Sequence, residues 1–546
     1  MSLPSGDPSM VRGQELRVWS AYTQLLESLL QLEKAIKDRV DLLIQPQRPV
    51  STEEQDTNLG RLMRRVTTLL QSGETSRPPA ASPHTPRAVG AHAQDQLQHP
   101  PGPLRVTYVS SELSNRGNDI MTLLNFSFQD FMSFLGDKFH KDENPLGFIN
   151  LGVCENKLCS DLVTKRLSQK DMDLIEDTLL QYPDRRGHPF LRKEVAWFLT
   201  HYCNSHAPLD PENVVVLNGS SAVFSALVTV LCDPGEAILT PTPFYGPFAL
   251  TASLYTKVHL IPVHLDSEVS EENPRPFQLT VDKLEQALWD AQLKGKKVKG
   301  FLLINPQNPL GDVYSRDSLQ EFLEFAKRNN LHMIVDERYL LSVFDESVTF
   351  HSVLSLRRLP DLSRTHVIWS TSKDFGIAGF RFGALYTHSK ELAAAVGSLG
   401  FLHGLSGITQ YKLSRLLQDR EWINRVFLPT SHNRLQAAHK YTTICLQGLG
   451  IPFLKRGSGL SIWINLRKYL NPCTFDQELC LHRRFLDHKV ILCPGKACMC
   501  SEPGWFCLVF AEKLPQLEQG LFRLQQALLE QEQELTERLV ANTMRE

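Results

Sequence analysis

The stretch Ser370-Thr371-Ser372-Lys373 places a lysine directly after small hydroxyl residues, and Arg381 follows eight residues later. A lysine amine can reach the carbonyl carbon of a bound molecule, while hydroxyls and a guanidinium can hold a phosphate dianion. Alone, such a run is weak evidence, because most lysines in runs of this kind are solvated surface residues. It gains weight only if matching motifs lie upstream in the right order.

Four short apolar segments are each followed at once by polar residues. The segments span 214–217, 301–304, 333–335 and 367–369, and they precede 218–221, 305–311, 336–339 and the lysine motif. Helical sequence lies between them, which is the pattern of a parallel α/β sheet whose ligands bind beyond the carboxyl ends of the strands. Gly219-Ser220-Ser221, at a predicted helix start, suits an anion because free N–H groups point outward there. We therefore expect these motifs to converge on one edge of the sheet.

Together with segments 152–158, 241–245 and 502–506, these motifs resemble the fold-type-I pyridoxal-phosphate enzymes of the class-I aminotransferase family. The likeness runs from about Asn144 to Ala527. More narrowly the chain resembles the 1-aminocyclopropane-1-carboxylate synthases, and it is identified as a member of the animal synthase-like branch. The resemblance implies an aspartate aminotransferase-like α/β fold, with a mostly parallel sheet in a large domain and a smaller α+β domain.

The resemblance also implies pyridoxal 5'-phosphate as the cofactor and assigns roles at its site. Lys373 would form the Schiff base, and Asp336 would pair with the protonated pyridine nitrogen. Glu155 matches a glutamate on the substrate side. The other implied cofactor contacts are the ring-stacking Tyr245, the phenolic-oxygen partners Asn308 and Tyr339, and the phosphate ligands Ser220, Ser221, Ser370 and Arg381.

Each of these residues also has an ordinary structural explanation. Asp336 can cap a helix, Asn308 can serve its proline-bracketed turn, and Tyr245 can be a half-buried aromatic residue. Lys373 can lie on a solvated face. Their joint occurrence, in order, behind four apolar strands favours the site over these explanations.

Two positions depart from the pattern of the family. Where the synthases have an arginine that grips the substrate carboxylate, this chain has Cys507, and a thiol is a weak donor without a positive charge. Replacement by Arg456 or Arg467 stays open. Arg185 stands where the synthases have a tyrosine that reaches the phosphate of the neighbouring subunit. It is either a phosphate partner in a homodimer, which the resemblance implies, or a surface charge.

The cofactor half of the site is therefore complete and the substrate half is damaged. This favours a pyridoxal-phosphate-binding homologue that lacks synthase activity and whose amino-acid substrate is in doubt. Two alternatives stay open. The first is an active transaminase or elimination lyase that holds an amino acid through another carboxylate contact. The second is a non-enzymatic interaction protein.

The chain has 546 residues, of which 42% are hydrophobic, and a formal net charge of -2. Such a balance gives no support for nucleic-acid binding or electrostatic adhesion to a membrane. No basic and apolar leader is visible and no apolar stretch is long enough to span a bilayer, so we expect a cytoplasmic location. Among the 11 cysteines, Cys493, Cys498, Cys500 and Cys507 lack the paired spacing of a zinc site, so we expect no metal.

Residues 1–71 are a predicted helical extension, in which apolar residues between Trp19 and Leu43 recur at three- and four-residue spacings. Either a short coiled coil or a single amphipathic helix explains the spacing, and this helix is a candidate surface for further interaction. The proline-rich segment 72–105 is a predicted disordered linker. The predicted small domain spans 106–167 and 408–535, and the predicted large cofactor-binding domain spans 168–407.

Overall fold

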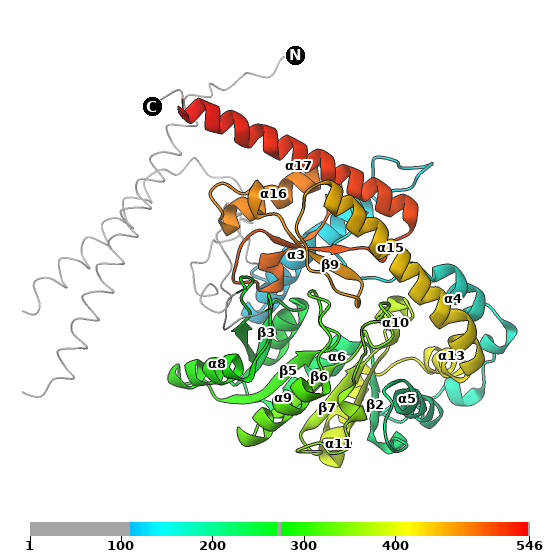
Figure 1. Ribbon diagram of the computed structural model, residues 1–546. Helices are drawn as coiled ribbons and strands as arrows, with labels where there is room; N and C mark the ends of the chain where they lie inside the picture. Colours follow the sequence, from blue (N-terminus) through cyan, green and yellow to red (C-terminus); the bar gives the residue numbers. More distant parts are fainter. Residues whose placement is uncertain (1–109, 270–274, 544–546) are drawn as a thin grey trace, which may run out of the picture. The chain divides into compact units, whose positions relative to one another are not determined.

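The computed structural model describes residues 110–269 and 275–543, which belong to one compact unit of the chain (Figure 1). The predicted extension at 1–71 and the predicted linker at 72–105 lie outside the described residues. The predicted domain boundaries stay predictions. None of the helices in the described ranges combines the length and the apolar character that crossing a bilayer requires.

A seven-stranded sheet forms the framework that carries the site. Its strands run in the order β2 (Val214–Leu217), β8 (Gly383–Thr387), β7 (Thr365–Trp369), β6 (His332–Asp336), β5 (Val298–Ile304), β3 (Ala237–Thr242) and β4 (His259–His264). Within this sheet β8 is antiparallel to both of its neighbours, and the other pairings are parallel. The prediction of a mostly parallel α/β sheet is confirmed.

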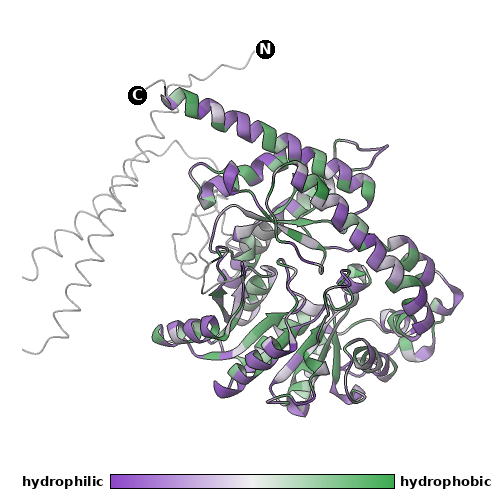
Figure 2. Cartoon of the chain, viewed as in Figure 1, coloured by the Kyte–Doolittle hydropathy of each residue, from purple (hydrophilic) through white to green (hydrophobic). Residues whose placement is uncertain are grey.

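Both faces of this sheet are buried, as near-continuous apolar strands require. Alternate residues of β5 enter separate cores, with Phe301 and Leu303 in one and Leu302 and Ile304 in the other. Figure 2 shows the strands largely apolar and the helices with mixed surfaces. The first core is completed by α5 (Pro189–Tyr202), α8 (Val281–Leu293) and α9 (Arg316–Arg328), and the second by α6 (Ser220–Leu231), α7 (Pro247–Thr251) and α11 (Lys390–Ser398).

The segments on either side of this region build further structure (Figure 1). A three-stranded antiparallel sheet has the order β11 (Cys493–Pro494), β12 (Trp505–Val509) and β9 (Ser461–Asn465), and β1 (Ile149–Asn150) pairs in parallel with β10 (Val490–Ile491). The longer helices here are α3 (Asn115–Gly136), α4 (Ser160–Leu167), α13 (Gly407–Gln418), α15 (Leu428–Gly448), α16 (Phe475–Asp487) and α17 (Leu514–Thr543). The C-terminal helix α17 packs on α15 and α16.

The predicted polar motifs lie at neighbouring strand ends of the sheet. Ile304 pairs with Asp336 and Asp336 pairs with Ile368, so β5, β6 and β7 end side by side. Leu217 at the end of β2 pairs with Gly383 at the start of β8. The predicted convergence on one edge is confirmed, and it follows from the parallel register.

Candidate functional site

Lys373 lies on α10 (Thr371–Asp374), the short helix that follows β7. The Ser370 hydroxyl caps this helix by accepting from the Ser372 backbone N–H at 3.1 Å. Lys373 is 8% exposed, and its Nζ donates to the carbonyl oxygen of Cys154. Burial lowers the pKa of Lys373. This favours the neutral amine, which is the form that attacks a carbonyl carbon.

Gly219, Ser220 and Arg381 meet at the N-terminus of α6. Gly219 has a φ of 109°, and a Cβ on it would lie 2.7 Å from Nη2 of Arg381, so the glycine lets the guanidinium approach this turn. Ser220 is buried, Ser221 is half-buried and Arg381 is exposed. Backbone N–H groups, hydroxyls and a guanidinium are the donors that a phosphate needs.

Asn308 and Tyr339 form a buried polar pair beside Cys154. Nδ2 of Asn308 donates to the Tyr339 hydroxyl at 3.0 Å, and Sγ of Cys154 lies 3.9 Å from Oδ1 of Asn308. Because the Cys154 carbonyl also holds Lys373, these predicted residues gather around one point of the segment between β1 and α4. Their side chains point inward and away from solvent.

Arg338, to which the sequence assigned no role, contacts two of the predicted cofactor-ring residues. Its Nε donates to Oδ2 of Asp336 at 2.8 Å, and its Nη2 donates to the same oxygen. Its guanidinium carbon lies 4.8 Å from the centre of the Tyr245 ring. Although burial acts in the opposite direction, the charge of Asp336 raises the pKa of Arg338. An arginine directly after a buried strand was the signal in the sequence that could have identified it.

Cys507 lies in the middle of β12, 3% exposed, and its thiol hydrogen-bonds that of Cys154. This hydrogen bond lowers the pKa of Cys154 to about 6 although burial opposes the shift. The same hydrogen bond, together with burial, raises the pKa of Cys507 well above its usual value. A carboxylate-binding site needs a positive charge, which neither thiol supplies.

The two alternative arginines hold other carboxylates. Arg456 forms an ion pair with Asp312, and Arg467 forms one with Glu502. Each guanidinium would have to break its ion pair before it could bind a substrate carboxylate. The structure therefore offers no arginine already positioned as the replacement among these two candidates.

Arg185 and Glu155 lie nearer the surface. Arg185 is exposed, and its guanidinium carbon lies 5.9 Å from the centre of the Phe401 ring. Glu155 is half-buried next to Cys154, and its charge opposes the effect of burial on the pKa of Lys373. The predicted contact of Arg185 with a second subunit and the predicted substrate role of Glu155 stay predictions.

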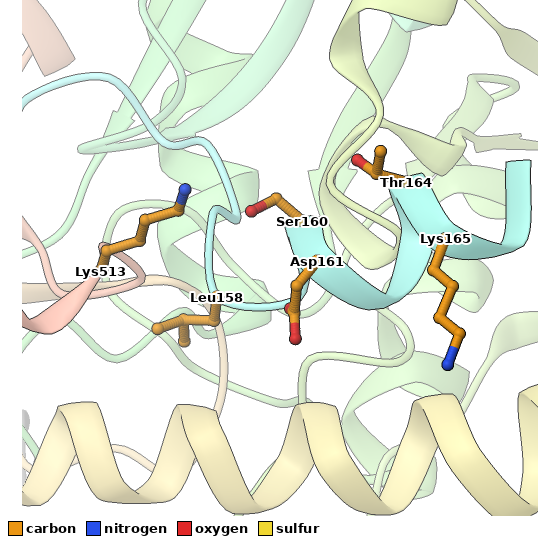
Figure 3. Close-up of a pocket in the computed structure, with 6 residues that line it drawn as sticks. All are labelled: Leu158, Ser160, Asp161, Thr164, Lys165 and Lys513. Carbon is orange, nitrogen blue, oxygen red and sulfur yellow. The ribbon is translucent and has the colours of Figure 1, made fainter. Parts of the chain in front are cut away.

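A surface pocket of about 640 Å³ opens at the start of α4 (Figure 3). It is lined by Leu158, Ser160, Asp161, Thr164, Lys165 and Lys513. None of these is a predicted site residue, and Asp161 is held by Arg434 at 2.6 Å. The chemistry expected of Lys373 therefore has no part in this pocket.

The cysteines near β12 are free thiols. Sγ of Cys493 lies 3.7 Å from Sγ of Cys498. Across residues 110–269 and 275–543, no group of three or more histidine, cysteine or acidic side chains is arranged to hold a metal ion.

We predict that Cys154 titrates with a pKa of about 6, because the hydrogen bond from Cys507 is the largest influence on it. The measurement is the difference in thiolate absorbance between the wild type and Cys154→Ser, which isolates the contribution of Cys154. This difference should fall as the pH drops through about 6. On a Cys507→Ala background the same difference should fall at a higher pH. Cys500→Ala, which removes another buried thiol, should leave the midpoint unchanged. A wild-type midpoint at the ordinary thiol value would contradict the prediction.

The comparisons with known proteins agree with this geometry. The family model "Aminotransferase class I and II" matches residues 147–521. A human protein named "Probable inactive 1-aminocyclopropane-1-carboxylate synthase-like protein 2" is 55% identical over 564 residues, which cover 100% of this chain and 99% of that protein. Human "1-aminocyclopropane-1-carboxylate synthase-like protein 1" is 56% identical over 426 residues, which cover 78% of this chain and 85% of that protein.

A solved structure shows the same fold. The aspartate aminotransferase of Thermotoga maritima superimposes with a TM-score of 0.57 at 22% identity, over 76% of this chain and 100% of that one. At that identity the likeness shows the fold alone, and it confirms the predicted aspartate aminotransferase-like architecture. The full-length relative and the matching family model establish the rest: the chain belongs to the class I and II aminotransferases, in the branch of the 1-aminocyclopropane-1-carboxylate synthase-like proteins.

Proposed function

We propose that this chain is a pyridoxal-phosphate-binding homologue of the 1-aminocyclopropane-1-carboxylate synthases that lacks synthase activity. The observation that carries the proposal is the buried Cys507 thiol, which stands where the synthases have their carboxylate-binding arginine. The "probable inactive" name of the full-length human relative is consistent with it.

The side chains at the strand ends fit the cofactor at its phosphate end and at its point of attachment. Ser220, Ser370 and Arg381 would hold the phosphate, and Lys373, whose pKa burial lowers, would bind the aldehyde carbon. Pyridoxal phosphate, when bound, supplies an electron sink for breaking bonds at the Cα of an amino acid. The ring end fits less well, because Arg338 already holds Asp336 and lies over Tyr245.

The substrate half of the site explains why synthase activity should be absent. A substrate carboxylate that loses its buried charged partner loses on the order of 3–5 kcal/mol, or several hundredfold in affinity and more. Neither Cys154 nor Cys507 supplies the positive charge that a substrate carboxylate needs. Cys154 and Cys507 thus disfavour the substrates that the synthases accept.

We predict that pyridoxal phosphate attaches to Lys373 and to no other lysine. After incubation with the cofactor and reduction with borohydride, peptide mapping should find the phosphopyridoxyl group on Lys373. Lys373→Ala should take up no label. Lys390, an exposed lysine near the same sheet, serves as the internal control for surface labelling. An unmodified Lys373 in protein saturated with the cofactor would refute the attachment.

We predict that the wild type turns over S-adenosylmethionine far more slowly than the roughly one per second of ordinary enzymes. Cys507→Arg should strengthen the change in cofactor absorbance on adding an amino acid, because it restores a two-pronged carboxylate partner. Cys507→Lys, a matched cation without that planar fork, should give a smaller gain. Wild-type turnover at about one per second or faster would show that the inactive assignment is wrong.

A further inference from the structure

We propose that the Arg338 guanidinium occupies the position of the pyridoxal ring in the cofactor-free protein. It contacts the residues predicted to bind the ring, and the cofactor must displace it in order to bind. The inference deepens the proposed function and rests on it for the identity of the cofactor. It concerns the affinity of the site for pyridoxal phosphate and is independent of catalysis.

The geometry places one side chain on both ring contacts. The resemblance assigns Asp336 to the pyridine nitrogen and Tyr245 to the face of the ring. In the structure Oδ2 of Asp336 accepts from Nε of Arg338 at 2.8 Å, and the Arg338 guanidinium carbon lies 4.8 Å from the Tyr245 ring centre. Phe248, which meets Tyr245 edge to face, is 4.7 Å from the same carbon. A pyridine ring stacked on this face of Tyr245 and bonded to Asp336 would overlap Arg338.

The two groups have similar chemistry, which permits the exchange. A guanidinium and a protonated pyridine ring are both flat, delocalised cations with N–H donors, and both stack on aromatic faces. Asp336 is fully buried, and a buried carboxylate needs a charged or hydrogen-bonding partner. Arg338 supplies that partner while the ring is absent. The bound cofactor would supply it instead, so its binding replaces one cation by another.

This exchange lowers the net gain from binding the cofactor. A site that kept Asp336 unpaired would gain a new ion pair when the ring enters, whereas this site must first break one that is wholly buried. Arg338, which is 2% exposed, must also find a new position. The predicted phosphate ligands lie on other segments, with Ser220 on α6 and Arg381 between β7 and β8, so the exchange concerns the ring end of the cofactor.

The test measures the dissociation constant of pyridoxal phosphate by absorbance titration of the full chain, together with the thermal stability of each protein with and without the cofactor. Arg338→Ala should bind at least about tenfold more tightly than the wild type, since every 1.4 kcal/mol gives a factor of ten. Without cofactor it should be less stable than the wild type, because Asp336 loses its partner. With cofactor its melting temperature should rise by more than that of the wild type.

Two further variants keep the result interpretable. Arg338→Gln leaves a neutral hydrogen-bond donor for Asp336 and should show a smaller gain in affinity, even if Arg338→Ala fails to fold. Arg166→Ala removes another buried arginine, whose ion pairs with Asp171 and Asp419 involve no predicted site residue, and should lose stability without any gain in affinity.

The outcomes separate the two proposals. Equal or weaker binding by both Arg338 variants, with binding by the wild type, would overturn the role of Arg338 and leave the proposed function intact. Binding by the Arg338 variants alone would support the role of Arg338 and overturn cofactor binding by the natural chain. Failure of all the proteins to bind would overturn both.

Discussion

The burial of the central sheet on both faces is the constraint on which the site depends. Helices cover each face, and successive residues of one strand, such as Leu302 and Leu303, enter different cores. The predicted polar site residues therefore lie beyond the carboxyl ends of the strands, where a parallel sheet leaves room for a ligand. The parallel register brings those ends together, with Asp336 between Ile304 and Ile368. A set of polar groups separated along the chain becomes one cluster for this reason.

Charged side chains that are buried at the edge of the sheet need ion-pair or hydrogen-bond partners. The residues at the end of β6 illustrate how these partners are supplied. Arg338 lies in the turn that follows β6, two residues beyond Asp336 at the end of the strand. Asp336 and Arg338 pair with each other. The intervening Glu337 is held elsewhere by the Ser352 hydroxyl at 2.5 Å and the Val353 N–H at 2.9 Å, and burial raises its pKa to about 7. The charged side chains at this strand end therefore already have partners within the protein.

The titratable groups on the substrate side of the site are arranged differently. Burial lowers the pKa of Lys373, which favours its neutral amine. Cys154 and Cys507 are both buried, and their contact shifts the pKa values of the two thiols in opposite directions. The nearby arginines, Arg456 and Arg467, are bound to acidic partners. Under the proposed function, this arrangement would keep the attachment chemistry of the fold without a positive charge to orient an amino acid.

The sequence by itself determined the fold class, the strands and the residues that follow them, because apolar runs punctuated by polar motifs are local properties of the chain. Lys373, Asn308 and Ser220 could be named on that basis. The family resemblance added the loss of an arginine at Cys507. The tertiary structure alone decided which partner each buried group takes. Arg338 was visible as a residue, but its place over Tyr245 depends on how two separate strand ends pack. The contact of Cys154 with Cys507 likewise joins distant segments, and the electrostatics of a buried group follow from such neighbours rather than from its position in the sequence.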